Sequence, residues 1–162
     1  MLKIGVLSDT HGRVPKQVYT FFKECDELWH AGDIGIGVLE ELQEFKPVEA
    51  VHGNMDTSDL MRLLPQTKLM ERGGLKVIMT HIGGWPGHYN KNILPLLLSE
   101  KPDIFVTGHS HILRVMYDEG YKMLHINPGA AGSQGFHKVS TLVRFTIDGT
   151  VKGLEICEFD KW

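Results

Sequence analysis

Short apolar runs alternate with amphipathic segments through the first half of the chain. The apolar runs over residues 3–8, 27–30 and 48–52 predict buried strands, because each is short and is followed by a polar or glycine-containing turn. Residues 15–25 and 38–45 carry apolar side chains at helical spacing, and a proline stands in the first turn of the former. The order strand, helix, strand, helix, strand is typical of a parallel α/β sheet.

The second half of the chain is richer in strands. The hairpin strands are expected at residues 67–71 and 75–80, 113–117 and 122–126, and 141–146 and 152–157. A helix is expected over 93–99 and a single strand over 104–107. We expect this half to form a second, mixed sheet that packs on the first, with helices covering both. Turn signals are spread evenly and no linker is visible, so residues 1–162 are expected to form one domain.

Composition narrows the class of protein. A chain of 162 residues, 42% hydrophobic and 23% charged, can bury a core without disulfides. Cys25 and Cys157 are expected to be free thiols in a reducing compartment. The first residues lack the layout of a signal peptide, and no apolar stretch is long enough for a membrane span, so a cytoplasmic location is expected.

Charge bears on the kind of ligand. The formal net charge is -3, and lysines and arginines are not clustered, which argues against a long nucleic acid as partner. A small phosphorylated molecule is compatible with this pattern, and no interaction with a membrane is expected.

Polar residues that can bind metals follow most of the predicted strands. They are Asp9, His11, Asp33, Asn54, His81, His109 and His111. The ends of parallel strands meet at one edge of a sheet, so we expect these side chains to converge. Carboxylate, amide and imidazole donors suit Mn, Fe, Zn, Co or Ni, and the lack of thiolates argues against a structural zinc site. Any one of these residues alone would be better explained as a turn former, a helix cap or a surface histidine; the set predicts a metal centre.

The motifs around these residues resemble a known superfamily. Asp9-x-His11, Gly32-Asp33, Gly53-Asn54, Thr80-His81 and Gly108-His109-Ser110-His111 are similar, in this order, to motifs of the calcineurin-like metallophosphoesterases. Asn127-Pro128-Gly129 resembles a loop of the small YfcE-type phosphodiesterase branch. The resemblance implies an α/β fold, a four-layer α-β-β-α sandwich of two mixed sheets flanked by helices, with a dimetal site on one rim.

The resemblance also implies a ligand set. Asp9, His11 and His111 would hold one divalent ion, Asn54, His81 and His109 would hold the other, and Asp33 would bridge them. Manganese is the expected metal, with Ni, Co, Fe or Zn as alternatives.

The implied activity is hydrolysis of a phosphate ester, preferably a phosphodiester, by a metal-activated hydroxide, with Asp33 and Asn54 as the central catalytic residues. Two alternatives stay open. One is a phosphomonoesterase or nucleotidase on the same site. The other is a non-catalytic protein-binding scaffold, the role attributed to the retromer subunit of this fold. A scaffold does not need the complete ligand set, so its presence favours an enzyme. A homo-oligomer also stays open, because exposed apolar hairpins could support a dimer.

Residues that would contact the substrate are less sharply defined. Met55 stands where many superfamily members have a histidine, and a thioether cannot donate a proton. The small branch commonly lacks that histidine, so the departure selects a branch. His52 is a candidate for facing the substrate. The glycine-rich loop after His81 is either a surface turn or a lid that brings Trp85 and His88 to the substrate.

Further residues near the motifs have open roles. Residues 127–132 could offer backbone N–H groups to a phosphate. His30 either orients a metal ligand or belongs to the core, and His125 and His137 receive no role from the sequence.

Overall fold

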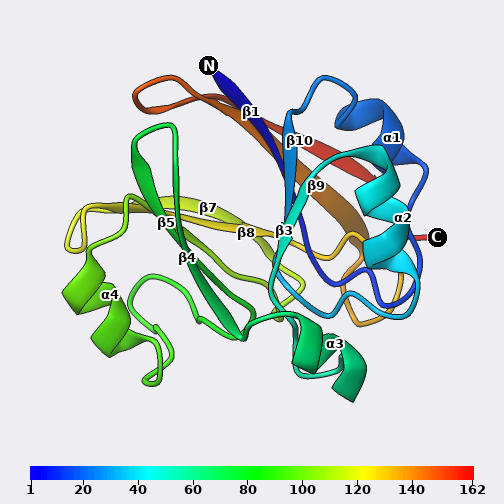
Figure 1. Cartoon of the computed structure of the whole chain (residues 1–162), viewed down its shortest axis with the longest axis horizontal. Coiled ribbons are helices and arrows are strands. Elements are labelled where there is room, and N and C mark those ends of the chain that lie inside the picture. The colour runs from blue at the N-terminus through cyan, green and yellow to red at the C-terminus, as the bar shows by residue number, and fades with distance from the viewer.

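The protein consists of two five-stranded sheets packed face to face, in a computed structural model that describes residues 1–162 (Figure 1). The first sheet has the order β10-β9-β1-β2-β3, and the second has the order β4-β5-β6-β8-β7. The strands of the first are β1 (Leu2–Leu7), β2 (Glu27–His30), β3 (Val48–Ala50), β9 (Val139–Ile147) and β10 (Val151–Asp160). Those of the second are β4 (Thr67–Arg72), β5 (Leu75–Thr80), β6 (Ile104–Val106), β7 (Leu113–Asp118) and β8 (Met123–Pro128).

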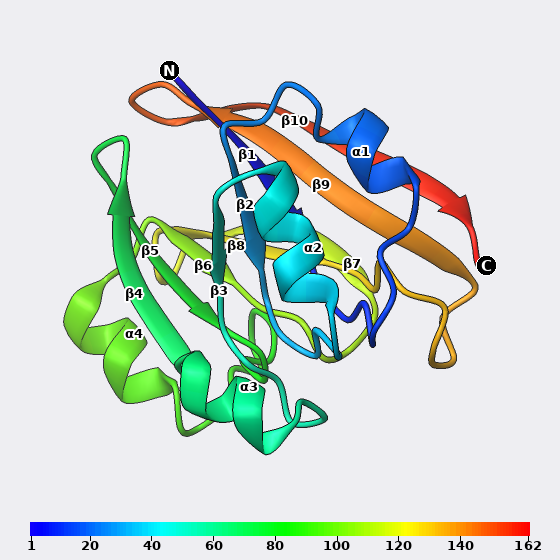
Figure 2. The ribbon, with the colours of Figure 1, turned by 45° about the vertical axis from the view of Figure 1, so that its right-hand side comes forward.

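Four helices complete the structure. They are α1 (Gln17–Phe21), α2 (Val38–Phe45), α3 (Ser58–Leu63) and α4 (Leu94–Glu100). Figure 2 shows α1 and α2 over the outer face of the first sheet, with α4 beside the second. No helix is both long and apolar enough to cross a membrane.

Three apolar clusters fill the spaces between these layers. The cluster around Trp29 and Phe145 lies between the two sheets, and both side chains are almost fully buried. A second cluster, which includes Phe22, joins the first sheet to α1 and α2. A third, which includes Phe105 and Leu97, joins the second sheet to α4. The layers therefore follow the order helix, sheet, sheet, helix, and the predicted four-layer sandwich is confirmed.

The last hairpin lies in the first sheet, which corrects the expectation that the second half of the chain builds the second sheet alone. Strand β9 pairs antiparallel with β1, with Ile4 opposite Phe145. Leu142 and Val143 are buried on opposite faces, towards the helices and towards the other sheet. The hydrophobic pattern predicts the hairpin but does not say which sheet it extends.

Two helices differ from the sequence pattern. Helix α1 is shorter than the predicted segment 15–25, because residues after Phe22 turn so that the chain can enter β2. Helix α3 is absent from the sequence-based expectation, since its six residues show less than two turns of periodicity. The side chain of Thr57 caps α3 by accepting a hydrogen bond from the Leu60 N–H. Cys25 and Cys157 are free thiols, as predicted.

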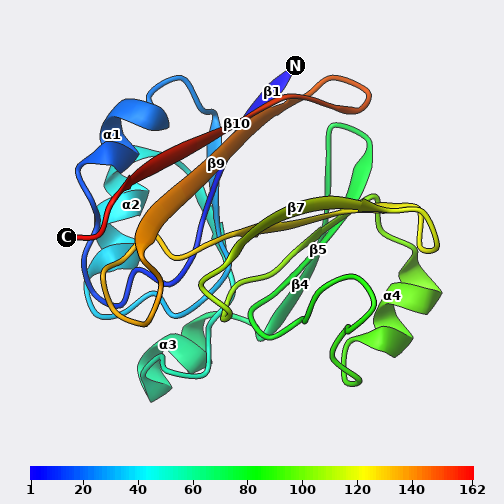
Figure 3. The same ribbon diagram turned by 180° about the vertical axis from the view of Figure 1, so that it is seen from behind.

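The carboxyl ends of the parallel strands of both sheets lie at one rim of the sandwich. Strands β1, β2 and β3 run parallel, and so do β5 and β6. The β4–β5 and β9–β10 hairpin turns lie together at the opposite rim (Figures 1 and 3). Across the shared rim, the His81 side chain bonds the Ala31 carbonyl at 2.8 Å, and the His109 N–H donates to Asp9 Oδ2 at 3.1 Å. These bonds bring the predicted ligand loops into one cluster.

Candidate metal centre

The loops at this rim hold several ligand candidates in left-handed backbone conformations. Asp9, His11, Asp33, His109 and His111 have φ values between 48° and 71°. Asp and His tolerate this region better than most residues, yet each such position costs about 1–3 kcal/mol. Only two other non-glycine residues in the chain share the conformation. Backbone strain is therefore concentrated where the sequence predicts metal ligands.

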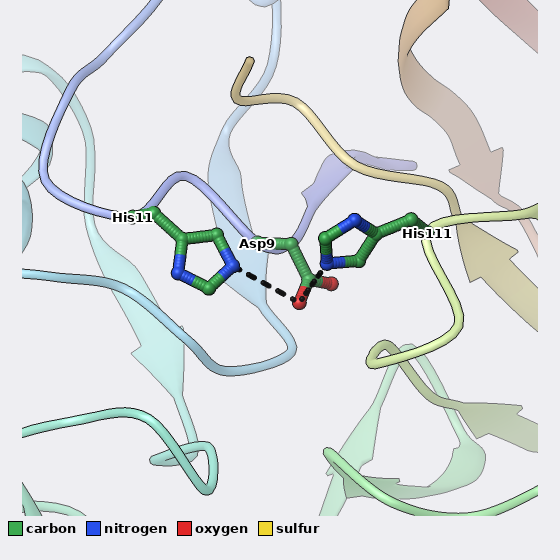
Figure 4. Close-up of side chains that lie close together, drawn as sticks. All are labelled: Asp9, His11 and His111. Atoms are coloured by element: carbon green, nitrogen blue, oxygen red, sulfur yellow. Dashed lines mark ion pairs between the residues drawn. The ribbon is translucent and has the colours of Figure 1, made fainter. Parts of the chain in front are cut away.

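The first group of donors consists of Asp9, His11 and His111, which we call the first triad. One ligand atom from each lies within 4.8 Å of the others. Figure 4 shows the Asp9 carboxylate between the two imidazoles. Its Oδ1 lies 3.8 Å from His11 Nε2 and 3.3 Å from His111 Nε2.

The second group consists of Asp33, His81 and His109, which we call the second triad, and its donors also lie within 4.8 Å of one another. Asp33 Oδ2 lies 3.1 Å from His81 Nε2 and 3.8 Å from His11 Nε2. Asp33 therefore reaches a histidine of each triad with one oxygen. Asp9 Oδ1 likewise lies 3.8 Å from His81 Nε2, so the two triads form one continuous centre.

The donor atoms fit a metal ion. Asp9 Oδ1, His11 Nε2 and His81 Nε2 are buried and have no hydrogen-bond partner. An unpaired buried polar atom typically costs about 1–3 kcal/mol, so three such atoms in one centre need partners from outside the chain. Divalent cations held by the two triads would satisfy all three, and oxygen and imidazole donors match their chemistry.

The pKa shifts of Asp9, Asp33 and His81 also indicate a site for a cation. Burial would raise the pKa of Asp9, but the imidazoles of His111 and His81 hold it below its usual range. Burial would also raise the pKa of Asp33, and His81 together with the Met55 N–H lowers it. For His81 burial lowers the pKa, and the Asp33 and Asp9 carboxylates more than offset this and raise it. The carboxylates thus stabilise a positive charge at the place where a metal ion would carry it.

Hydrogen bonds orient each carboxylate. Asp9 Oδ2 accepts from Ser8 Oγ at 2.6 Å and from the His109 N–H, which leaves Oδ1 for the centre. Asp33 Oδ1 accepts from the Met55 N–H at 2.8 Å, which leaves Oδ2. Gly53 must be glycine here, because a Cβ atom would overlap the Asp33 carboxylate.

Two histidines have their ring tautomers fixed by neighbours. His81 Nδ1 must donate to the Ala31 carbonyl, so Nε2 presents its lone pair to the centre. The His137 Nε2–H donates to the Gly132 carbonyl at 2.8 Å, which leaves His137 Nδ1 as an acceptor. His111 Nδ1 lies 3.3 Å from it and donates, so His111 Nε2 also presents a lone pair.

His30 ties together the loops that carry Asp9 and Asp33. The Gly32 N–H donates to His30 Nδ1 at 3.1 Å, and His30 Nε2 then donates to Thr10 Oγ1 at 3.0 Å. Burial lowers the pKa of His30 to about 3, so the ring stays neutral. Both roles considered from the sequence apply, because the residue is buried and also positions ligand loops.

Asp56 ties the Asp33 loop to the segment that follows β3. Its Oδ1 accepts from the Ile34 and Gly35 N–H groups, and its Oδ2 accepts from the Gly53 N–H at 2.8 Å. The sequence does not reveal this role or that of His137, because the contacts that matter, Asp56 with Ile34 and His137 with His111, join residues more than twenty positions apart. The only sequence signal is indirect, since Asp56 follows the Gly53-Asn54 motif and His137 follows the Asn127-Pro128-Gly129 motif.

The remaining candidates of the first loops lie beside the centre. Asn54 lies between Gly53 and Met55, whose backbones contact Asp33, and its side chain is exposed. Met55 is 64% exposed. His52 is half-buried, and its ring lies 3.4 Å from the Gly53 carbonyl, outside both triads.

The loop after His81 borders the centre. A cavity of about 220 Å³ is lined by Trp85 and His88 together with His109. The Trp85 and His88 rings lie 5.4 Å apart, and Trp85 is 40% exposed. Tyr89, in contrast, bonds Asp118 and packs under the second sheet, away from this cavity. The structure thus brings Trp85 and His88 next to a second-triad histidine and leaves His52 apart.

The segment 127–132 is hydrogen-bonded to the loops that carry Asp9 and His109. Several of its N–H groups are used in these bonds, which corrects the expectation that they face a phosphate. The Ala131 and Gly132 N–H groups bond the Ser8 and Asp9 carbonyls. The Gly129 N–H bonds the Asn127 side chain, whose Nδ2 holds the Gly108 carbonyl at 2.9 Å.

Comparisons with known proteins agree with this site. Residues 2–150 match a model of the calcineurin-like phosphoesterase superfamily domain. A probable metallophosphoesterase of Methanothermobacter thermautotrophicus is 31% identical over 94% of this chain and 90% of its own length. A phosphodiesterase of Methanocaldococcus jannaschii is 26% identical over 79% of this chain and 83% of its own. The solved structure of a Vps29 mutant from Entamoeba histolytica has a similar fold, with a TM-score of 0.75 and 19% identity over 98% of this chain and all of that one. On the family match and the first of these relatives, the chain belongs to the calcineurin-like phosphoesterase superfamily, whose members bind divalent metals.

Proposed function

We propose that this protein is a phosphodiesterase that works with two divalent metal ions, Mn²⁺ first among them. One observation carries the proposal: two triads of metal donors share a centre in which Asp33 Oδ2 lies within 3.8 Å of a histidine from each. The relative named as a phosphodiesterase supports the choice of a diester.

Charge explains how such a centre would attract a phosphate ester. The donor set contains two carboxylates, Asp9 and Asp33, and four imidazoles, which must be neutral to bind metal. Two divalent ions against two carboxylates leave a net charge of about +2. A phosphodiester monoanion would offset part of this excess, and a neutral ester would offset none of it.

Different residues would bind the metal ions and the substrate. When bound, two such ions would act as Lewis acids on the phosphate oxygens and lower the pKa of water. Asp9, His11 and His111 would hold one ion and His81, His109 and Asn54 the other, with Asp33 between them. Trp85 and His88, which line the cavity at His109, would contact the organic part of the substrate.

The test starts from chelated protein. Reloading with Mn²⁺, Co²⁺, Ni²⁺ or Zn²⁺ should restore turnover of bis(p-nitrophenyl) phosphate, with Mn²⁺ the most effective. Bound metal, measured by elemental analysis, should fall in His11→Gln and stay at the wild-type level in His52→Gln, a histidine outside both triads. If the metal-loaded protein hydrolysed no mono- or diester, the proposed enzymatic function would be wrong and the scaffold alternative would be favoured.

A phosphomonoesterase on the same centre is the second outcome of this experiment. A panel of p-nitrophenyl phosphate and nucleoside monophosphates, assayed beside the diesters, separates the two. Higher kcat/KM on the monoesters would overturn the diester proposal while leaving the metal centre in place.

A further inference from the structure

Two cavities flank the segment that carries His109 and Ser110. The first, of about 220 Å³, lies on the side of the loop after His81. The second, of about 450 Å³, lies on the side of residues 135–137. His109 and Ser110 line both cavities, so the two cavities meet at a ligand of the second triad.

Each cavity presents one aromatic and one isoleucine side chain to solvent. Ile82 and Trp85 in the first are each 40% exposed. In the second, Ile112 is 59% exposed and Phe136 is completely exposed. A phenylalanine with its whole surface in water contributes nothing to the core, and exposed apolar groups beside a polar centre are typical of ligand contacts.

The wall between the cavities is held in place. Asn127 is buried, and its Nδ2 donates to the Gly108 carbonyl and to Ser110 Oγ at 2.9 and 3.1 Å. Ser110 Oγ also accepts from the Ile112 N–H. Because these bonds fix the segment, the cavities are two separate spaces on either side of it.

We propose that the two cavities receive the two ester groups of a phosphodiester whose phosphate lies at the metal centre, with Trp85 and Phe136 as the aromatic contact in each. The proposal rests on the proposed function and narrows its substrate class. A diester with two aromatic or nucleobase-bearing groups would fill both cavities, whereas a monoester would fill one. Trp85 and Phe136 are then specificity-determining residues.

Equilibrium binding tests this inference without turnover. Diphenyl phosphate, an unactivated diester, and phenyl phosphate, the monoester with one ring, are titrated by calorimetry into Mn²⁺-loaded wild type, Trp85→Ala and Phe136→Ala. Loss of a stacking partner should weaken binding about tenfold. We expect diphenyl phosphate to bind more weakly to both variants, and phenyl phosphate to bind more weakly to only one of them.

Kinetics with p-nitrophenyl esters gives a second reading. The kcat/KM for bis(p-nitrophenyl) phosphate should fall in both variants, mainly through KM. In the wild type, kcat/KM should be higher for bis(p-nitrophenyl) phosphate than for ethyl p-nitrophenyl phosphate. This ratio should decrease in at least one variant, the one that lacks the aromatic residue of the cavity in which the ethyl group would lie. Leu98→Ala, which removes an exposed apolar side chain on α4 that lines neither cavity, is the control and should change neither value.

The outcomes separate the two proposals. Absence of turnover on every ester would overturn the proposed function. Diester turnover in which Phe136→Ala or Trp85→Ala leaves two-ring diesters unaffected would overturn the two-cavity inference alone. Equal losses for mono- and diesters in both variants would also overturn it, because a one-ring ligand cannot occupy both cavities.

Discussion

Each triad consists of one aspartate and two histidines, but neighbouring residues support the two triads in different ways. In the first triad His111 is held by another side chain, since its Nδ1 bonds His137, which in turn bonds the Gly132 carbonyl. In the second triad His81 is buried and directly bonds the main-chain carbonyl of Ala31, the residue that follows β2. The second triad also has an open side, because His109 is exposed and borders both cavities.

The two triads therefore differ in how firmly their histidines are held. The partner of the His81 ring is a buried main-chain carbonyl, whereas the partner of the His111 ring is another side chain, which has more freedom to move. The second triad therefore combines a fixed interior with an exposed ligand next to the proposed substrate cavities. The first triad depends on a side chain outside the donor set, so it should respond to substitution of a residue that is not itself a ligand.

The largest effect is expected at the residue that joins the triads. Asp33→Asn removes the carboxylate whose Oδ2 lies near His11 and His81, and two nearby dications would lose a shared negative charge. Removing one member of a buried charge set costs about 3–5 kcal/mol. A loss of that size in transition-state stabilisation corresponds to about 10²- to 10⁴-fold in kcat/KM. His111→Ala and Asn54→Ala should lose less. Comparable losses in all three variants, with metal content measured for each, would contradict a bridging role for Asp33.

A smaller effect should follow from removing the side-chain support of the first triad. His137→Ala leaves His111 free to rotate and change tautomer, which should weaken one of two Mn²⁺ binding events by about 10- to 100-fold. Calorimetric titration of the apo protein measures both events.

Ser140→Ala is the matched control for His137→Ala. The Ser140 hydroxyl donates to the same Gly132 carbonyl at 2.9 Å and is not bonded to His111. If Ser140→Ala weakened Mn²⁺ binding as much as His137→Ala, the effect would come from the loop around Gly132. In that case His137 would not position His111.

Acid should weaken the second triad in a graded way. The pKa of His81 is raised above its ordinary value of 6.5 by Asp33 and Asp9, despite burial, so below this pKa a metal ion must displace a proton. Affinity should then fall about tenfold per pH unit, beginning above pH 6.5. Mn²⁺ titrations at several pH values in His11→Ala report mainly on the second triad, and those in His109→Ala on the first. Affinity that rises or stays constant on acidification in His11→Ala would show that His81 does not compete in this way.

The sequence predicts that the candidate donors converge, but it does not reveal what supports them. Asp9 and Asp33 stand after apolar strands, and the parallel order brings those strand ends together, so local pattern and topology predict this convergence. Asp56 reaches Ile34 and His137 reaches His111, each more than twenty residues away, and no periodicity encodes such contacts. The exposed Phe136 shows the same limit, because only the folded chain places it beside His111.

The smallest expected effect concerns Met55, which lies next to Asp33 of the second triad. Its N–H bonds Asp33, but its side chain is exposed and cannot donate a proton. Without an acid, the rate should fall steeply as the pKa of the leaving group rises. Met55→His should flatten this dependence, speeding alkyl esters by up to about tenfold. General acid catalysis can supply about 10²–10⁴-fold, but the new ring would not be positioned by neighbours. Nitrophenyl esters, which leave as stable anions, should change little.

Two other histidines decide whether this account of Met55 holds. His88 lines the cavity at His109, where a leaving group would lie in the proposed complex, so it is the first alternative donor to test. His52 is close in sequence but lies outside both cavities described above, beside the Gly53 carbonyl. A shallow leaving-group dependence in the wild type would show that a donor is already present. If His88→Ala or His52→Ala then steepened it, that residue would be the donor. The protein would then already have a proton donor in that histidine, and position 55 would not need to supply one.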